Sequence, residues 1–295
     1  MNHWIAAARL RTLPLSVSGI IVGSAYAYYQ NKFSWIIFLL AILTTLSFQI
    51  LSNFANDYGD GIKGTDDNRI GEKRLVGSGE ISSKQMKNVI IANGFISFLL
   101  SISLIYVSFG KENFVYSLLF LGLGIASITA AIKYTVGNNA YGYSGFGDVF
   151  VFLFFGLVAV LGSNFLFSKT IDMLLILPAI AIGMLSVAVL NLNNMRDIEN
   201  DKISNKNTIV VKNGLSWAKN YHHFLLLTPF VCLFVFSIGT DKMILFIFLI
   251  FIFFLKHLEK VRKSHNHADF DPELKKVALG TFAISLLIFI SFFRK

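Results

Sequence analysis

Two clusters of amide and carboxylate side chains carry most of the chemistry that this sequence offers. The first lies within NFANDYGD, residues 53–60, and the second within NLNNMRDIEND, residues 191–201. On a helix, the Asn and Asp side chains of each cluster fall within an arc of about 100°, so they share one wall. The members of the first cluster are Asn53, Asn56, Asp57 and Asp60, and those of the second are Asn193, Asn194, Asp197 and Asp201.

These residue types predict a site for a hard cation. Carboxylates stacked along a helix repel each other by roughly 3 kcal/mol per pair at an effective dielectric of 20, and a bound cation relieves that repulsion. Oxygen ligands without His or Cys suit Mg²⁺, which usually completes its coordination with phosphate oxygens and water. We therefore expect Mg²⁺ and a diphosphate here, with Asn56, Asp57, Asp60, Asp197 and Asp201 as metal ligands. The alternative is a pair of solvated polar caps on two helices.

The helices that carry these clusters must cross a membrane. Of the 295 residues, 55% are hydrophobic and 15% are charged, which is typical of a polytopic membrane protein rather than a soluble domain. Apolar runs of roughly 17 to 25 residues, long enough to span the bilayer as helices, predict an all-α integral membrane protein with about nine transmembrane helices around a cavity. The predicted spans are 13–30, 33–54, 88–109, 113–133, 146–167, 171–191, 221–239, 242–258 and 277–293.

The distribution of basic residues predicts the orientation. With a cytoplasmic N-terminus, 20 of the 26 Lys and Arg residues fall in cytoplasmic segments, as the positive-inside rule requires. The net charge of +9 is then mostly a topology signal, and no nucleic-acid motif accompanies it. Four spans separate the two polar clusters, so both face the cytoplasm. We expect a multi-pass protein of the cell inner (cytoplasmic) membrane whose polar site opens on the cytoplasmic side.

Basic and amide side chains near the clusters are predicted to contact the substrate. A diphosphate needs several cations, although lysines and arginines on this side of a membrane often serve only as topology signals. The predicted diphosphate contacts are Lys63, Arg69, Arg74, Arg196 and Lys206, together with the amides Asn53, Asn56, Asn193 and Asn194.

The two motifs carry a family resemblance. NDYGD (56–60) and DIEND (197–201) resemble the NDxxD and DxxxD motifs of the UbiA-type intramembrane prenyltransferases. Segments 9–25, 56–82, 134–163 and 193–208 further resemble the branch of that family that acts on 1,4-dihydroxy-2-naphthoate in menaquinone synthesis. The resemblance implies one prenyltransferase domain over residues 1–295. It also implies Mg²⁺-dependent transfer from a polyprenyl diphosphate to the naphthoate with decarboxylation, giving demethylmenaquinone. The catalytic residues would be Asp57, Asp60, Asp197 and Asp201.

The acceptor site is predicted near the loop 133–145. Lys133 and Tyr134 follow the fourth span and are expected to contact the acceptor, although Lys and Tyr also anchor helix ends at a membrane interface. Arg11, just before the first span, is a further candidate for the acceptor carboxylate.

Two other functions stay open from the sequence. One is a related prenyltransferase with a different aromatic acceptor, and the other is a polytopic transporter. In secondary transporters charged residues tend to lie near the bilayer midplane, whereas here they gather at the helix ends.

Overall fold

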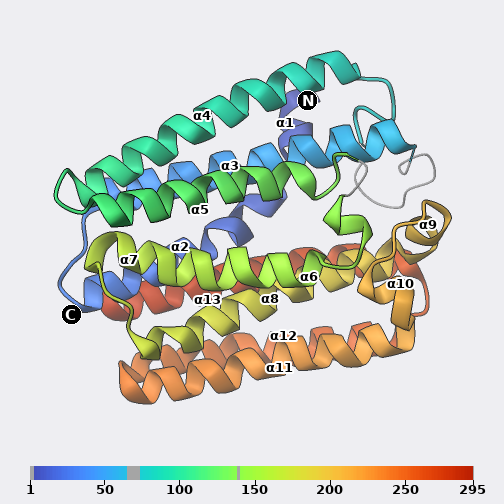
Figure 1. Cartoon of the computed structure of the whole chain (residues 1–295). Helices are drawn as coiled ribbons and strands as arrows, with labels where there is room; N and C mark the ends of the chain where they lie inside the picture. The colour runs from blue at the N-terminus through green and yellow to red at the C-terminus, as the bar shows by residue number, and fades with distance from the viewer. Residues whose placement is uncertain (1–2, 65–73, 138–139, 295) are drawn as a thin grey trace.

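The computed structural model describes residues 3–64, 74–137 and 140–294, and these residues form a bundle of long helices joined by short loops (Figure 1). The first half of the chain contains α1 (His3–Ala8), η1 (Leu10–Thr12), α2 (Leu13–Tyr29), α3 (Trp35–Lys63), α4 (Ser83–Phe109) and α5 (Phe114–Lys133). The connection that follows contains η2 (Tyr141–Tyr143), and the next crossing is built from α6 (Gly147–Val151), η3 (Phe152–Gly162) and α7 (Ser163–Ser168).

The second half of the chain is also helical throughout its described part. It contains η4 (Met173–Leu175), α8 (Ile176–Arg196), α9 (Ile198–Ile203), α10 (Ile209–Asn213), α11 (Leu215–Gly239), η5 (Lys242–Phe246), α12 (Ile247–Lys263), η6 (His267–Asp269) and α13 (Phe270–Phe293). The short helices α9 and α10, the C-terminal end of α3 and the connection between α5 and α6 lie at the same end of the bundle, which we call the polar end (Figure 1).

Local sequence signals explain where several helices begin and end. Ser82 caps α4 by accepting from the backbone N–H of Gln85, while the Gln85 side chain accepts from the backbone N–H of Ser82. α3 ends at Gly64, whose φ of 69° is a left-handed conformation that glycine adopts without strain. These signals end α3 just beyond Asp60 and so place the first polar cluster at the end of the bundle.

Close helix contacts fix the position of the second half. A Cβ atom on Gly156 would lie 2.7 Å from the carbonyl oxygen of Ala179, so η3 and α8 pack backbone to backbone. The largest buried apolar cluster surrounds α8 and includes Leu185, Leu192 and Leu226. α8 is thus the central helix against which α11, α13 and η3 pack, and it delivers the second polar cluster to the polar end.

The prediction of an all-α membrane protein is confirmed. Eight helical segments within the described residues are long and apolar enough to cross a membrane. The predicted span 242–258 is also helical, but it is divided between η5 and α12, and α12 has only 17 residues. The C-terminal part of α12 carries Lys260, Arg262 and Lys263. Because these charged residues end its apolar stretch, this segment has a shorter apolar span than the other eight.

Candidate active site

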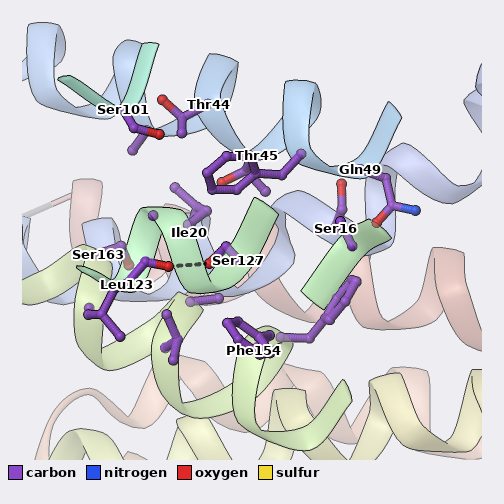
Figure 2. Close-up of a pocket in the computed structure, with 18 of the residues that line it drawn as sticks. Ser16, Ile20, Thr44, Thr45, Gln49, Ser101, Leu123, Ser127, Phe154 and Ser163 are labelled. Atoms are coloured by element: carbon purple, nitrogen blue, oxygen red, sulfur yellow. Dashed lines mark hydrogen bonds between the residues drawn. The ribbon is translucent and has the colours of Figure 1, made fainter. Parts of the chain in front are cut away.

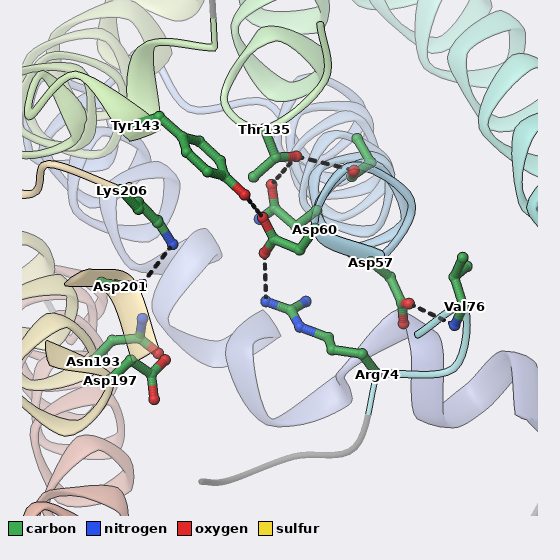
Figure 3. Close-up of polar contacts among 12 residues, drawn as sticks. Asp57, Asp60, Arg74, Val76, Thr135, Tyr143, Asn193, Asp197, Asp201 and Lys206 are labelled. Atoms are coloured by element: carbon green, nitrogen blue, oxygen red, sulfur yellow. Dashed lines mark hydrogen bonds and ion pairs between the residues drawn. The ribbon is translucent and has the colours of Figure 1, made fainter. Parts of the chain in front are cut away.

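A cavity of about 240 Å³ lies at the polar end, between α3, η1, α8 and α13. Asn53, Asn56 and Asp60 of the first predicted cluster line it, and so does Asn193 of the second, whereas Asn194, Asp197 and Asp201 do not. Figure 3 shows Asp60 on one side of this space and Asn193 with Asp197 on the other. The predicted site residues that line the cavity are Asn53, Asn56, Asp60, Arg74, Tyr134, Asn193 and Lys206.

Asp60 is held from two sides. Its carboxylate accepts a hydrogen bond from the Tyr143 hydroxyl over 2.9 Å and pairs with the Arg74 guanidinium over 3.3 Å (Figure 3). Neighbouring Gly59 permits this arrangement, because a Cβ atom there would lie 2.6 Å from the Thr135 hydroxyl. Thr135 in turn donates to the side-chain oxygen of Asn56 over 3.2 Å. The end of α3 therefore packs directly on the loop that carries Tyr143.

The second cluster is ordered by Arg196. Its guanidinium pairs with both carboxylate oxygens of Asp197, at 2.7 and 2.8 Å, and donates to the Asn193 oxygen over 2.7 Å. It also pairs with Asp271 at the start of α13. Lys206 lies 3.6 Å from Asp201 (Figure 3). Arg196 therefore acts within the wall, since it orients the oxygens of its neighbours and is itself buried away from the cavity.

Asp57, predicted as a metal ligand, does not face the cavity in the structure. Its two carboxylate oxygens accept the backbone N–H groups of Leu75 and Val76, at 3.1 and 2.9 Å, and the residue is 1% exposed. It does not line the cavity. The helix arc placed Asp57 beside Asp60, but the chain returning toward α4 covers that part of the arc. In this geometry Asp57 holds the segment that carries Arg74.

Several predicted substrate contacts also lie outside the cavity. Lys63 is exposed, and its ammonium group donates to the Thr135 carbonyl oxygen over 2.9 Å and sits 3.9 Å from the centre of the Tyr143 ring. Lys133 is exposed and lines neither of the two cavities described in this section. Asn194 is buried outside the cavity, and Arg69 lies outside the described residues.

Other basic residues line the cavity instead. Arg9 and Arg11 enter it from the N-terminal segment, and Lys275 enters from α13. Arg11 lies 3.6 Å from Asp271. Arg11 was predicted from its position before the first span, whereas no local signal distinguishes Lys275 from the other lysines between residues 256 and 276. These three side chains bring positive charge to the cavity, and Asp271 lies beside Arg11.

The η2 loop contributes tyrosines that the sequence did not single out as ligands. Tyr141 stacks on Phe150 with ring centres 4.0 Å apart and donates to the Ala130 carbonyl oxygen over 2.9 Å. Burial raises the pKa of the Tyr141 phenol, so it stays a donor at neutral pH. Tyr141 thereby fixes the loop from which Tyr143 reaches Asp60.

A site for a hard cation at this cavity needs oxygen donors from both α3 and α8. Among the described residues, no three His, Cys, Asp or Glu side chains converge as a metal-binding group. The candidate donors that line the cavity are the oxygens of Asn56, Asp60 and Asn193, and Arg74 lies next to Asp60. Asp197 lies behind this wall, with both carboxylate oxygens paired with Arg196. Amide and carboxylate oxygens of this kind fit Mg²⁺ that shares its coordination with a phosphorylated substrate.

A second, mainly apolar cavity of about 220 Å³ adjoins the first and lies between α3, α4, α5 and η3 (Figure 2). Gln49, Ser52, Val151 and Phe155 line both cavities. Several hydroxyls along the second cavity donate within their own helices, since Thr44 donates to the Leu40 carbonyl oxygen over 2.7 Å and Ser127 to that of Leu123 over 2.8 Å. An apolar space therefore lies next to a charged one.

Comparison with known proteins agrees with this geometry. The model of the UbiA prenyltransferase family matches residues 16–288. The 1,4-dihydroxy-2-naphthoate octaprenyltransferase of Haemophilus influenzae is 42% identical over 97% of this chain and 94% of its own. The Escherichia coli protein of the same name is 40% identical over 98% and 94%.

Solved structures share the fold. A UbiA homologue from Archaeoglobus fulgidus, bound to GPP and Mg²⁺, superposes with a TM-score of 0.72 at 15% identity, covering 99% of this chain and 98% of its own. The apo structure of a UbiA homologue from Aeropyrum pernix also gives a TM-score of 0.72, at 12% identity over 97% and 98%.

Proposed function

Because this chain belongs to the UbiA prenyltransferase family, we propose that it transfers a polyprenyl group from its diphosphate to 1,4-dihydroxy-2-naphthoate. The carboxyl group leaves as CO₂ and the product is demethylmenaquinone in its reduced form. Two curated relatives with at least 40% identity over nearly the whole chain are named for this acceptor, which favours it over other aromatic acids. Family membership also sets the transporter alternative aside.

The adjacency of the two cavities, which share four lining residues, carries the proposal. An amphiphile with an anionic head and a long apolar tail needs one space lined by charge and a second lined by hydrocarbon. Here Gln49 and Phe155 lie where the cavity with Asp60, Arg74 and Lys206 meets the apolar one. A polyprenyl diphosphate therefore fits with its head at the polar end and its tail between α3, α5 and η3.

Residues of both walls would hold the diphosphate. Asn56, Asp60 and Asn193 line the cavity and would supply oxygens for Mg²⁺, with the Asp197 carboxylate behind them, and Arg74 and Lys206 are the cations at the same cavity. When bound, Mg²⁺ supplies positive charge that stabilises the leaving diphosphate. Arg74 and Lys206 add to that stabilisation because they already lie at the cavity wall, so little reorganisation is needed as charge develops.

The remaining residues protect and orient the reacting carbons. As the bond between the allylic carbon and the diphosphate oxygen breaks, the apolar walls, including Val151 and Phe155, exclude water from the carbocation. A ring carbon of the naphthoate then forms the new carbon–carbon bond, and loss of CO₂ restores the aromatic ring. Arg11 and Lys275 line the same cavity as Asp60 and are the basic groups that would hold the acceptor carboxylate.

The polar end is proposed to face the cytoplasm, where both substrates would enter. The support is the excess of basic residues at this end, since 20 of the 26 Lys and Arg residues fall in the segments assigned to it.

A panel of acceptors tests the proposal. Purified protein is incubated with Mg²⁺, octaprenyl diphosphate and, separately, 1,4-dihydroxy-2-naphthoate, 1-hydroxy-2-naphthoate and 4-hydroxybenzoate. We expect prenylated product mainly from the dihydroxynaphthoate. Preferential prenylation of another acid would show that the acceptor is different. Hydrolysis of octaprenyl diphosphate without prenyl transfer, or no reaction with any of the three acids, would overturn the proposal.

A further inference from the structure

Gln49 lies where the two cavities meet, on the face of α3 that continues to Asn53, Asn56 and Asp60. Its side chain lines both cavities, and Figure 2 shows it among the residues around the apolar one. Under the proposed function, the diphosphate head of the donor joins its prenyl tail at this junction. The acceptor ring must therefore approach the reacting carbon of the donor close to Gln49.

Hydrogen bonds that begin in the N-terminal segment fix the orientation of the Gln49 amide. Asn53 donates through Nδ2 to the Ala8 carbonyl oxygen over 2.8 Å, and a carbonyl oxygen can only accept. The other end of the Asn53 amide is therefore its oxygen, and Gln49 Nε2 donates to this Oδ1 over 3.1 Å. The Ala8 carbonyl oxygen thus determines, through Asn53, which end of the Gln49 amide is the nitrogen.

Thr12 accepts from both of these amides. Its hydroxyl donates to the Arg9 carbonyl oxygen over 2.9 Å, so it meets the amide nitrogens as an acceptor. Asn53 Nδ2 donates to it over 3.1 Å and Gln49 Nε2 over 3.4 Å, which engages both N–H groups of Gln49. No group among the described residues donates to the Gln49 oxygen. That oxygen is accessible, unlike the buried and unpaired side-chain oxygen of Asn194.

Only a hydrogen-bond donor can pair with the Gln49 oxygen. The diphosphate and the acceptor carboxylate offer acceptors at neutral pH, and the prenyl chain has no polar hydrogen. The hydroxyl groups of the naphthoate are the remaining donors among the reactants. Its 1-hydroxyl stands next to the carboxylate and can donate to it within the molecule. The 4-hydroxyl has no such internal partner and needs one from the protein.

We propose that Gln49 determines acceptor specificity by accepting a hydrogen bond from the 4-hydroxyl of the naphthoate. This inference rests on the proposed function, because it assigns a residue to the choice among aromatic acids. The Gln49 oxygen is preorganised, since Asn53 and Thr12 already hold the amide nitrogen and little ordering is needed on binding. Arg11, the neighbour of Thr12, lines the same cavity and would hold the carboxylate of the same ring.

Binding of two acids that differ by this one hydroxyl tests the inference without turnover. Dissociation constants of 1,4-dihydroxy-2-naphthoate and 1-hydroxy-2-naphthoate are measured by calorimetry with Mg²⁺ and inorganic diphosphate, under nitrogen to prevent oxidation. The unaltered protein should bind the dihydroxy acid about tenfold more tightly, and Gln49→Met should lose most of that preference. The constant for the 1-hydroxy acid should change less than about twofold, because that acid does not use the Gln49 oxygen.

Two further variants separate hydrogen bonding from a general effect. Gln49→Glu keeps an oxygen acceptor and should retain the preference, since repulsion from the added charge acts on both acids alike. Gln85→Met is the control, because it makes the same exchange at an exposed position of α4 that lines neither cavity. It should change neither dissociation constant.

Several results would overturn the inference. One is equal binding of the two acids by the unaltered protein, a result that depends on no variant. Others are an equal loss for both acids in Gln49→Met, or an unaltered preference in that variant. Ser52 also lines both cavities, so loss of the preference in Ser52→Ala but not in Gln49→Met would assign the contact to Ser52. Binding of neither acid by the unaltered protein would instead count against the proposed function.

Discussion

The Arg74 guanidinium lies 3.3 Å from the Asp60 carboxylate, and both side chains are almost fully buried at the edge of the polar cavity. A buried charge that loses its partner destabilises a protein strongly, so the pair holds this part of the site in a defined shape. A magnesium diphosphate offers each member a new partner of the correct sign. The pair thus explains how a site rich in carboxylates can be stable before its substrate arrives.

Asp60→Asn should reduce transfer by at least about 100-fold, because the amide matches the carboxylate in size but lacks the negative charge needed to hold a metal that stabilises the leaving group. The measurement is kcat/KM at saturating Mg²⁺ together with the Mg²⁺ concentration for half-maximal activity, which should rise. Asp197→Asn should behave in the same way. Glu259→Gln, an exposed carboxylate on α12, is the control and should leave both quantities unchanged. Turnover by Asp60→Asn at the unaltered rate would refute the assignment.

Arg11→Met should raise the Michaelis constant for the naphthoate about tenfold or more and that for the prenyl diphosphate much less. The physical reason is the loss of a cavity-lining charge that would pair with the acceptor carboxylate under the proposed function. Lys133→Met is the direct comparison. The sequence favoured Lys133 for this contact, but its exposed position outside both cavities predicts nearly unaltered constants. The reverse pattern would restore the sequence-based assignment.

This contrast illustrates what the sequence could and could not predict. The apolar runs were sufficient to predict the helices, and the spacing of Asn and Asp was sufficient to predict which face of α3 and α8 carries polar side chains. Both predictions depend on local periodicity. The engagement of Asp57 by Leu75 and Val76, and the reach of Tyr143 to Asp60, depend on how loops return over helix ends. No local pattern encodes those contacts. Lys275 enters the cavity because of how α13 packs, which sequence periodicity alone does not determine.

His257→Leu should lower stability more than His257→Gln. His257 joins α11, α12 and α13, since its Nε2 lies 2.8 Å from His222 Nε2 and its Nδ1 lies 2.6 Å from a Glu273 oxygen. Glutamine can still donate to Glu273 and accept from His222, whereas leucine leaves buried polar groups unsatisfied at a cost of about 2 kcal/mol. The apparent Tm in detergent should fall by roughly 4 to 8 °C for leucine and by less than half of that for glutamine. Equal losses would show that packing, not hydrogen bonding, is responsible.

Reporters should place residues 205 and 295 on opposite sides of the membrane. Between them lie α11, the η5–α12 segment and α13, which make three crossings if η5 and α12 together span the bilayer. A reporter inserted next to Asn205 should be cytoplasmic and one fused after Lys295 should not. The same side for both would mean that the η5–α12 segment does not cross.

The stoichiometry of the products distinguishes prenyl transfer with decarboxylation from the other reactions of a prenyl diphosphate. Purified protein is given Mg²⁺, octaprenyl diphosphate and 1,4-dihydroxy-2-naphthoate carrying an isotopic label in its carboxyl group, and prenylated naphthol, diphosphate and labelled CO₂ are quantified together. Transfer with decarboxylation at the joined cavities predicts equal amounts of all three, and none of them once divalent cations are chelated. Diphosphate release without labelled CO₂, or a prenylated product that retains the label, would contradict the account.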